Sequence, residues 1–402
     1  MKNTHRDYDI ILFGATGFTG RLTAEYLARE GGKDLRWALA GRNPAKLAAV
    51  RESLAAIDPQ CAELPLLDAD INDAGGMRAL AESARVIITT VGPYILYGET
   101  LVAACAEAGT DYVDLTGEPE FVDTMWLRHQ DTALKSGARL VHCCGFDSIP
   151  HDLGAYYTVQ QLPPDVPLTV RGYVRAGGTF SSGTYHSAIH AFSRMRDYSK
   201  VRQARVARER DPESKRRVGD AGGGVQFNHE LDTWVVPFPS VDPQIVKRSA
   251  RALDRYGPDF RYAHFVQVKK LHSVAALIGG AGAVFVAAQF GPSRDWLLSK
   301  RKSGDGPSPE QRAKGWFRVR FFGEAKDAAK TRVAVDVRGG DPGYGETSKM
   351  LAESALCLAF DELPDRAGQL TTAAAMGDAL IVRLQRAGIS FEVVSSESKV
   401  VA

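Results

Sequence analysis

The chain has 402 residues, of which 24% are charged and 44% are hydrophobic, and its net charge is +2. This length allows two domains, and the near-neutral charge excludes a general attraction to nucleic acid. The five cysteines lack paired spacing, which indicates free thiols in a reducing compartment. No apolar signal segment precedes the first predicted strand, so we expect a cytoplasmic protein.

Apolar strand-like runs alternate with helical patterns through the first third of the chain, which is typical of a parallel sheet with helices on both faces. The predicted strands are 10–13, 36–40, 63–67, 86–91, 112–115 and 139–141, and the predicted helices are 18–30, 44–56, 73–83, 98–109 and 120–136. We therefore predict an α/β fold in which residues 1–145 form a Rossmann-type domain with a doubly wound parallel sheet.

The pattern changes in the remaining residues, 146–402, which we assign to a second, α+β domain with a mixed or antiparallel sheet. Strands are predicted at 168–175, 263–269, 316–323, 332–338 and 389–394, and helices at 184–198, 344–359 and 372–387. The polar segment 299–315 is rich in Gly, Pro and Lys and is predicted to be a loop.

A glycine-rich segment lies between the first predicted strand and the first predicted helix. Closely spaced glycines let the backbone turn sharply and approach a pyrophosphate, and the new helix points its unpaired N–H groups at the negative charge. Its position at the start of the chain makes this pattern stronger than an isolated GxxGxxG. The residues predicted to hold the pyrophosphate are Gly14, Ala15, Thr16, Gly17, Phe18, Thr19 and Gly20.

Arg42 follows the second predicted strand, where an NAD-specific site usually carries an acidic residue. An arginine there can bind a 2′-phosphate, so we predict NADP(H) as the cofactor; the alternative is a surface arginine at a helix start. Asp68 ends the third predicted strand and is a candidate partner for the adenine amino group. Helix capping through Asp70 to Asp73 is an equally good interpretation of that segment.

Three further segments follow predicted strands on the same sheet edge. Val91, Gly92, Pro93 and Tyr94 are candidates for the nicotinamide contact, with Tyr94 as a proton donor or as a packed aromatic residue. The segment 114–118 contains two carboxylates, for which capping of the following helix is the favoured interpretation. Gly145, Phe146 and Asp147 join the two predicted domains, so we place them against the nicotinamide, with Asp147 as a candidate catalytic residue.

His186 is the third candidate catalytic residue, as a proton donor inside the helix after a Gly/Ser turn, although a structural histidine is the more frequent case. His186 and His190 lack an HExxH context, so we predict no metal site. None of the thirteen tyrosines has a lysine four residues later, which excludes the catalytic dyad of the short-chain alcohol dehydrogenases.

Two segments suggest contacts outside the site. Residues 194–217 are strongly basic, which indicates a solvated helix face or a docking surface for an acyl carrier domain. Residues 274–290 carry no charge, which indicates a buried or re-entrant helix or, alternatively, peripheral contact with a membrane or lipid surface. The oligomeric state is not determined by any pattern.

The motifs at 14–20, 40–42, 91–94, 114–118 and 145–150, with those at 304–308, 315–317 and 341–347, resemble the saccharopine-dehydrogenase-like oxidoreductases. Within that family the chain is most similar to the trans-acting enoyl reductases. The resemblance implies an NADP-binding Rossmann domain, terminal helices that return to it, and a role in lipid or glycolipid biosynthesis. It also implies membrane association for some members, here at the inner face of the plasma membrane.

We therefore predict an NADP(H)-dependent oxidoreductase, a trans-acting enoyl reductase that reduces an acyl or polyketide thioester. A saccharopine-type amino-acid dehydrogenase and a non-catalytic NADP-binding protein at a lipid surface remain as alternatives. The hydride chemistry belongs to the cofactor in either enzyme.

Overall fold

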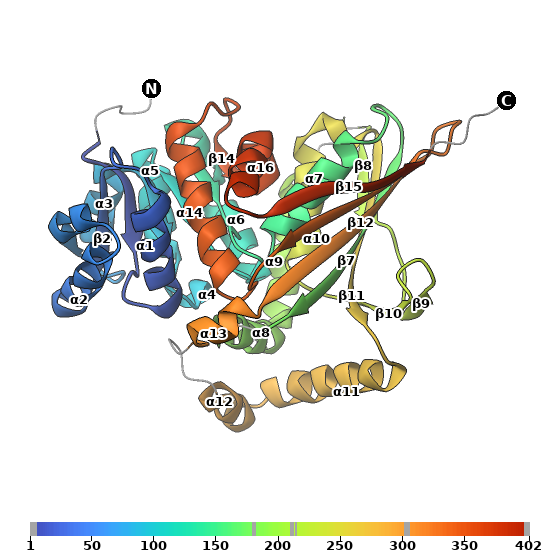
Figure 1. Cartoon of the computed structure of the whole chain (residues 1–402), viewed down its shortest axis with the longest axis horizontal. Coiled ribbons are helices and arrows are strands. Elements are labelled where there is room, and N and C mark those ends of the chain that lie inside the picture. Colours follow the sequence, from blue (N-terminus) through green and yellow to red (C-terminus); the bar gives the residue numbers. More distant parts are fainter. Residues whose placement is uncertain (1–5, 179–181, 210–212, 214, 301–305, 398–402) are drawn as a thin grey trace.

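A computed structural model describes residues 6–178, 182–209, 213, 215–300 and 306–397 (Figure 1). The first sheet has seven parallel strands in the order β14-β6-β5-β4-β1-β2-β3, which contains the Rossmann order 3-2-1-4-5-6. The strands are β1 (Tyr8–Phe13), β2 (Trp37–Gly41), β3 (Leu66–Asp68), β4 (Ala84–Thr89), β5 (Asp111–Asp114), β6 (Arg139–Val141) and β14 (Gly368–Leu370).

The helices of this part are α1 (Phe18–Glu30), α2 (Pro44–Ala55), α3 (Ala74–Ser83), α4 (Tyr94–Tyr97), α5 (Glu99–Ala108) and α6 (Pro119–Ser136), with a 3-10 turn at Pro59–Glu63. Helices α5 and α6 end at glycines in the left-handed conformation, Gly109 and Gly137, with φ of 71° and 83°. The predicted Rossmann-type fold is confirmed, and each predicted strand and helix of this part is present with small shifts at its ends.

The second sheet is mixed and has eight strands, seven of them in the order β15-β13-β12-β7-β11-β10-β9, with β8 paired to β11. Strands β7 and β11 are parallel, while β12 runs antiparallel to both β7 and β13. The strands are β7 (Leu168–Gly177), β8 (Arg217–Asp220), β9 (Gln226–Asn228), β10 (Thr233–Pro237), β11 (Asp259–Val268), β12 (Trp316–Ala325), β13 (Arg332–Gly339) and β15 (Ser390–Glu397). This mixed sheet confirms the predicted α+β character of the second part.

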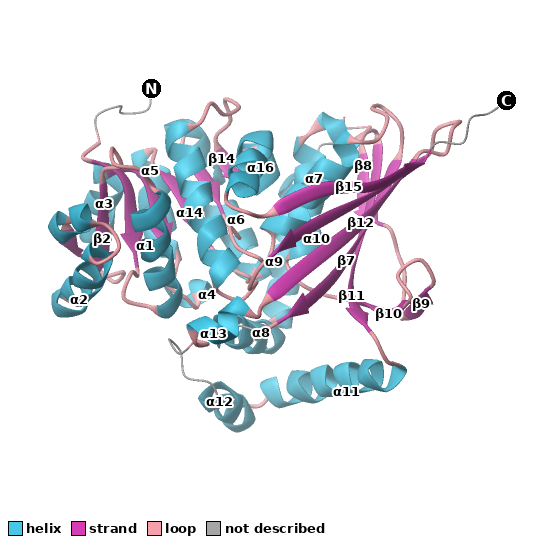
Figure 2. Ribbon diagram, in the orientation of Figure 1, coloured by secondary structure: helices cyan, strands magenta, loops and turns pink. Residues whose placement is uncertain are grey.

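The helices that accompany the second sheet are α7 (Ile149–Gln160), α8 (Ser182–Ser193), α9 (Met195–Glu209), α10 (Asp242–Ala252), α11 (Leu271–Ala288), α12 (Gly291–Ser299), α13 (Pro309–Ala313), α14 (Gly345–Phe360), α15 (Thr372–Ala375) and α16 (Gly377–Arg386), with a 3-10 turn at Asp254–Tyr256. Figure 2 shows helices gathered between the two sheets. Helix α7 packs against β7, β12 and β13, and α14 packs against α1, β4 and β5.

Two sequence predictions in the second part need correction. The helix predicted at 184–198 is two helices, α8 and α9, and α9 continues to Glu209. The predicted loop 299–315 contains α13, whose start is capped by Ser308 and Gln311, while residues 301–305 lie outside the described part of the chain. Helices α7 and α10 were not predicted; each carries a proline, Pro150 or Pro243, in its first turn.

Helix α11 is the third correction. It is long and apolar enough to cross a membrane by length and composition, with a mean hydropathy of 1.8, yet only 11% of that window is buried. Of its residues only Val274 and Ala288 are buried, and Figure 1 shows α11 and α12 along the lower edge of the molecule, where α11 contacts β10 and β11. Ala288 packs with Ile189 of α8 and Leu297 of α12, which anchors one end of the helix. The interpretation of 274–290 as a buried helix is therefore wrong.

The buried carboxylate of Asp152 joins three helices of the second part. It accepts hydrogen bonds from Ser249 Oγ at 2.5 Å, Thr372 Oγ1 at 2.8 Å and the Ala373 amide at 2.8 Å. Asp152 lies on α7, Ser249 on α10 and the other two on α15. Replacing the carboxylate would leave these buried donors unpaired.

We expect Asp152→Ala to lower the free energy of unfolding by about 3 kcal/mol, because several buried donors lose their acceptor at once. Chemical denaturation followed by circular dichroism measures this change. Asp254→Ala is the matched control, since that side chain is fully exposed and pairs with Arg216 at the surface. We expect this control to stay within about 0.5 kcal/mol of the wild type; an equal loss in both variants would contradict the role of Asp152.

Candidate functional site

The glycine-rich loop connects β1 to α1 and packs against the end of β4. Gly14 has φ of +94°, and a Cβ on it would lie 2.8 Å from both Thr90 Oγ1 and Val91 Cγ2. A Cβ on Gly20 would collide with the Gly14 carbonyl oxygen, so the first turn of α1 packs directly on the loop. Both positions therefore require glycine, the first for its backbone conformation and both for close packing.

The start of α1 is open to a ligand. Gly17, the residue before the helix, is exposed, and among the described residues no side chain caps α1 and no acidic residue stands in its first turn. The first amides of a helix have no partner within the helix, and the helix dipole makes this end attractive to anions. Ala15 is buried, while Thr16 and Thr19 are half-buried along the loop.

Phe18 points toward the second part of the chain. Its ring lies 4.7 Å from the ring of Tyr344 in an edge-on contact, and the Arg312 guanidinium lies 5.6 Å from its centroid. Ser348 Oγ also donates to the Thr19 carbonyl at 3.4 Å. Helices α13 and α14 therefore cover one side of the loop. The side chain of Phe18 therefore packs against the second part of the chain.

Arg42 and Asp68 stand on neighbouring strand ends. Gly41, the last residue of β2, pairs with Asp68, the last residue of β3, and both Arg42 and Asp68 are exposed. The cap of α2 is Asn43, which accepts from the Lys46 amide at 3.0 Å, so Arg42 is not needed to start that helix. The cap of α3 is Asp73, which leaves Asp68 outside the capping role.

Tyr94 is buried below the loop that follows β4. Its hydroxyl donates to the Thr89 carbonyl at 3.2 Å and accepts from the Leu115 amide at 3.4 Å, and burial raises the pKa of this phenol well above its usual value. Its ring packs against Phe121, at 5.8 Å between centroids. These contacts favour the packing interpretation of Tyr94, whose role as a proton donor stays a prediction. Val91 and Pro93 are half-buried and Gly92 is exposed at the same strand end.

Neither acid of the segment 114–118 caps the following helix, α6, which has no side-chain cap hydrogen bond. Glu118 accepts from the amides of Tyr94 and Ile95, at 3.0 and 2.9 Å, and so caps α4, and it accepts from Ser187 Oγ of α8 at 3.0 Å. Asp114 accepts from His142 Nδ1 at 2.6 Å and from the Cys143 amide at 3.0 Å. The predicted capping of α6 by these residues is therefore wrong.

The loop after β6 lies between the two sheets. The Phe146 amide donates to Thr347 Oγ1 of α14 at 3.2 Å, and the Phe146 ring lies 5.0 Å from the ring of Phe317 on β12. A Cβ on Gly145 would lie 3.1 Å from Thr347 Cγ2, so this approach is close. Burial alone raises the pKa of Asp147 to about 6. Thr347 and Phe317 are site-lining residues that the sequence analysis missed.

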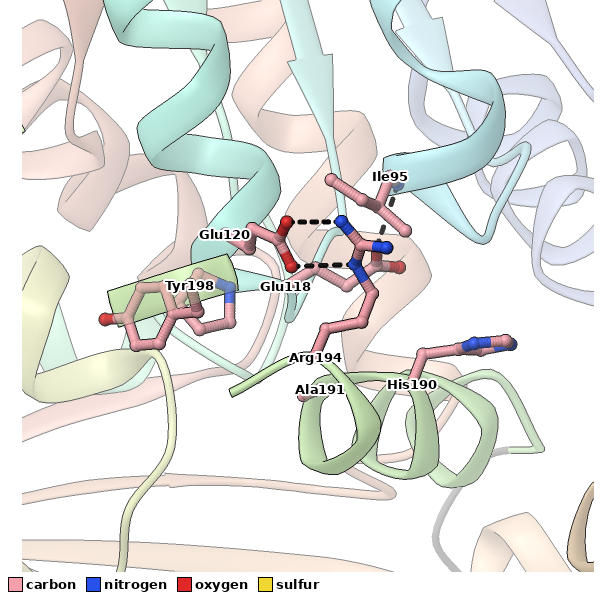
Figure 3. Close-up of a pocket in the computed structure, with 8 residues that line it drawn as sticks. Ile95, Glu118, Glu120, His190, Ala191, Arg194 and Tyr198 are labelled. Atoms are coloured by element: carbon pink, nitrogen blue, oxygen red, sulfur yellow. Dashed lines mark hydrogen bonds and ion pairs between the residues drawn. The ribbon is translucent and has the colours of Figure 1, made fainter. Parts of the chain in front are cut away.

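A small cavity lies beside Glu118, with a volume of about 30 Å³ (Figure 3). It is lined by Ile95, Glu118, Pro119, Glu120, His190, Ala191, Arg194 and Tyr198. The Arg194 guanidinium closes one side, donating from Nε and Nη2 to the Glu120 carboxylate at 2.9 and 2.6 Å. His186 lies on α8, the helix that also carries the lining residues His190 and Ala191. Its side chain is half-buried, and its ring lies 6.0 Å from the ring of Tyr185. Its role as a proton donor stays a prediction.

Much of the basic charge in 194–217 is neutralised within the chain. Besides Arg194, Arg205 is buried and pairs with Asp123 at 3.1 Å, and Arg208 pairs with Asp131 at 2.7 Å. These acids lie on α6, so α9 is held against the first domain by ion pairs. Residues 210–212 and 214 lie outside the described part of the chain. Arg205 is the one buried residue of α9, which is otherwise exposed or half-buried, in agreement with the interpretation as a solvated helix face.

Comparisons with known proteins find relatives that match nearly the whole length of the chain. Residues 10–140 match the family described as the saccharopine dehydrogenase NADP binding domain. A Mycobacterium tuberculosis protein, provisionally named a trans-acting enoyl reductase, is 38% identical over 98% of this chain and 99% of its own length. A protein of Mycobacterium ulcerans named trans-acting enoyl reductase is 35% identical over 97% of this chain and 98% of its own length. The chain belongs to the saccharopine-dehydrogenase-like oxidoreductase family.

The resemblance inferred from the sequence motifs is thus confirmed, and the chain is an NADP-binding oxidoreductase of this family. Solved structures support the fold. Saccharopine dehydrogenase from Saccharomyces cerevisiae superimposes with a TM-score of 0.58, over 96% of this chain and all of that one, at 11% identity. This likeness concerns the fold of both parts and says nothing of the substrate.

The observed geometry fits an NADP group in this oxidoreductase. The two glycine positions leave space that a Cβ would fill, the start of α1 offers unpartnered amides, and Arg42 is exposed at the strand end that holds the adenosine ribose in Rossmann domains. When bound, the cofactor supplies the hydride chemistry. The glycine-rich loop and Arg42 are the residues that would hold its phosphates.

We expect Arg42→Ala to weaken NADPH binding by about 1–3 kcal/mol and to change NADH binding little, because the lost bonds are charge-assisted bonds to the 2′-phosphate. Isothermal titration calorimetry with both cofactors measures the difference. Arg29→Ala is the matched control, since that exposed arginine lies at the far end of α1. An equal loss of NADPH and NADH binding in Arg42→Ala would contradict this role.

Proposed function

We propose that this oxidoreductase is an NADPH-dependent, trans-acting enoyl reductase that reduces the carbon–carbon double bond of a carrier-tethered acyl or polyketide thioester in lipid or glycolipid biosynthesis. The observation that carries the proposal is the similarity to proteins named trans-acting enoyl reductases, which spans 97–98% of this chain rather than the Rossmann domain alone. The second part of the chain, which must shape a substrate site, is therefore included in the likeness.

The site residues suit this reaction. In the proposal, the loops 91–94 and 145–147 hold the nicotinamide between them at the carboxyl edge of the parallel sheet, where such folds bind their ligands. Reduction of an enoyl thioester also requires a proton at the carbon next to the carbonyl. Asp147 is the candidate donor of the proposal, because a carboxyl group with a pKa of about 6 keeps a protonated fraction near neutral pH.

Rates of NADPH oxidation with each substrate distinguish an enoyl reductase from an amino-acid dehydrogenase. We expect the purified protein to oxidise NADPH when a 2-enoyl thioester is added, and not when 2-oxoglutarate and lysine are added. Absorbance of the reduced nicotinamide measures both rates. Asp147→Asn should lower kcat by about 10²-fold or more while NADPH still binds, if this carboxyl group donates the proton.

Each other outcome has a clear meaning. Turnover only with 2-oxoglutarate and lysine would replace the proposal by the alternative of a saccharopine-type amino-acid dehydrogenase. Binding of NADPH without turnover of either substrate would favour the non-catalytic alternative. An unchanged kcat in Asp147→Asn would remove that residue from the reaction and leave the enoyl reductase proposal standing.

A carrier domain needs a docking surface, and the proposal places it on the exposed side of α9. Although Arg194, Arg205 and Arg208 pair with acids of α6, the exposed residues Arg196, Lys200 and Arg202 of the same helix remain at the surface. Acyl carrier domains present a phosphopantetheine arm with its anionic phosphate, for which basic side chains are suited partners.

We also propose that the protein, expected in the cytoplasm, associates peripherally with a lipid surface through α11, at the inner face of the plasma membrane. The support is the exposure of its apolar side chains: Ile278 is 50% exposed, Val286 58% and Phe290, just beyond the helix, 63%. Lys269 and Lys270 precede the helix and Arg294 and Lys300 follow it, while residues 274–290 carry no charge. An apolar helix flanked by basic residues is suited to an anionic interface.

We expect the protein to float with vesicles of mixed neutral and anionic phospholipid in a density gradient. The double variant Ile278→Asp and Val286→Asp should remain at the bottom, because each charge would enter the apolar layer. Leu134→Asp is the matched control, since that leucine on α6 is 52% exposed and lies on another surface. Flotation of the double variant, or none of the wild type, would contradict the proposal.

A further inference from the structure

Two histidines and an aspartate converge in the second part of the chain, outside the glycine-rich loop 14–20. His151 lies in the first turn of α7, Asp242 is the first residue of α10, and His264 lies on β11. One ligand atom of each residue lies within 4.8 Å of the others. Asp242 Oδ2 is 3.7 Å from His151 Nε2 and 3.6 Å from His264 Nε2.

All three side chains are almost completely buried: His151 is 1% exposed, Asp242 2% and His264 4%. Within the described residues, His151 Nδ1, Asp242 Oδ1 and His264 Nε2 have no hydrogen-bond partner. Buried polar atoms are nearly always paired, so the unpaired His264 Nε2, which faces Asp242 Oδ2 at 3.6 Å, indicates a partner that is not a protein side chain. The unpaired His151 Nδ1 and Asp242 Oδ1 are the second polar atoms of the two residues whose Nε2 and Oδ2 face each other. Asp152, another buried aspartate, shows the contrast, since its carboxylate accepts three hydrogen bonds.

The surroundings orient the three groups. Ser240 Oγ donates to Asp242 Oδ2 at 2.5 Å, and the Tyr262 hydroxyl lies 3.4 Å from His264 Nδ1. In the tautomer whose Nδ1–H donates to the Tyr262 oxygen, the free lone pair of His264 is at Nε2, the atom that faces Asp242. The two imidazole rings are held edge-on to each other, with centroids 4.5 Å apart. Such outer contacts are typical of residues that bind a metal ion.

We propose that His151, Asp242 and His264 together bind one divalent transition-metal ion of the zinc and cobalt class. Two imidazoles and one carboxylate are the ligand types that these ions prefer, and three protein ligands are the number found where a fourth position is left to water or substrate. Burial favours uncharged imidazoles, which is the state in which histidine binds a metal.

The proposed metal site lies close to the candidate nicotinamide loop 145–147. The Phe146 ring lies 5.6 Å from the His151 ring, and His151 follows Asp147 by four residues. Metal binding and the enoyl reductase activity are nevertheless separate claims, because the measurements that test them differ. If the metal-binding proposal fails its test, the enoyl reductase proposal still stands, and the reverse also holds.

The sequence analysis found no metal motif because the three residues are far apart in the chain. His151 and Asp242 are separated by 91 positions, and His264 follows Asp242 by 22. No local spacing such as HExxH exists to reveal them. His264 lies in the predicted strand 263–269, whereas His151 and Asp242 lie in helices that were not predicted.

The test uses the full chain, first treated with a chelator and then titrated with Co²⁺. We expect about one ion per chain, visible as the ligand-field absorption of four-coordinate cobalt, and a matching zinc content by mass spectrometry after Zn²⁺ is added. Asp242→Asn and His264→Gln should lose this absorption. His229→Ala, an exposed histidine near β9, is the matched control and should keep it.

Tyr262→Phe retains all three ligands and removes only the hydroxyl near His264 Nδ1. We expect it to weaken Co²⁺ binding by about tenfold or more, as is usual for a lost outer contact. NADPH binding by each variant verifies that the variant is folded. The proposal is overturned if the wild type shows neither cobalt absorption nor a thermal shift with Zn²⁺, or if Asp242→Asn binds Co²⁺ as tightly as the wild type.

Discussion

The packing of α14 between the two parts of the chain is the constraint on which the rest of the site depends. Most of this helix is buried, and it contacts α1, β4 and β5 of the first sheet. At its start, Thr347 holds the Phe146 amide and Ser348 reaches the Thr19 carbonyl. One helix end therefore touches both the glycine-rich loop and the loop of the candidate nicotinamide site. Its position sets the distance between them.

Four of the buried carboxylates differ in the hydrogen-bond partners that surround them. Asp114, Glu118 and Asp152 each accept several hydrogen bonds from amides, hydroxyls or a histidine, so their charge is compensated where they are buried. These three connect elements that are distant in the sequence. Asp242 is compensated by Ser240 alone and faces two imidazoles. A structural role accounts for the first three, whereas the fourth points to a ligand.

The elements of the first domain could be predicted from the sequence because local patterns decide them. Short apolar runs bounded by glycine, and helices that end at Gly109 and Gly137, need no knowledge of distant residues. The helix starting at Ile149 was not predicted; Pro150 stands in its first turn, where proline is well tolerated. The short strands β8, β9, β10 and β14 were not predicted.

By itself, the sequence determined the Rossmann domain, its glycine-rich loop and Arg42 at the end of β2, because strand, turn and helix start are consecutive there. Only the tertiary structure decided which acids meet which bases: Glu120 pairs with Arg194, 74 residues away, and Asp123 with Arg205, 82 residues away. It also decided that α11 is exposed rather than buried and that His151, Asp242 and His264 converge. Burial and long-range pairing depend on how distant segments pack, and no local spacing encodes them.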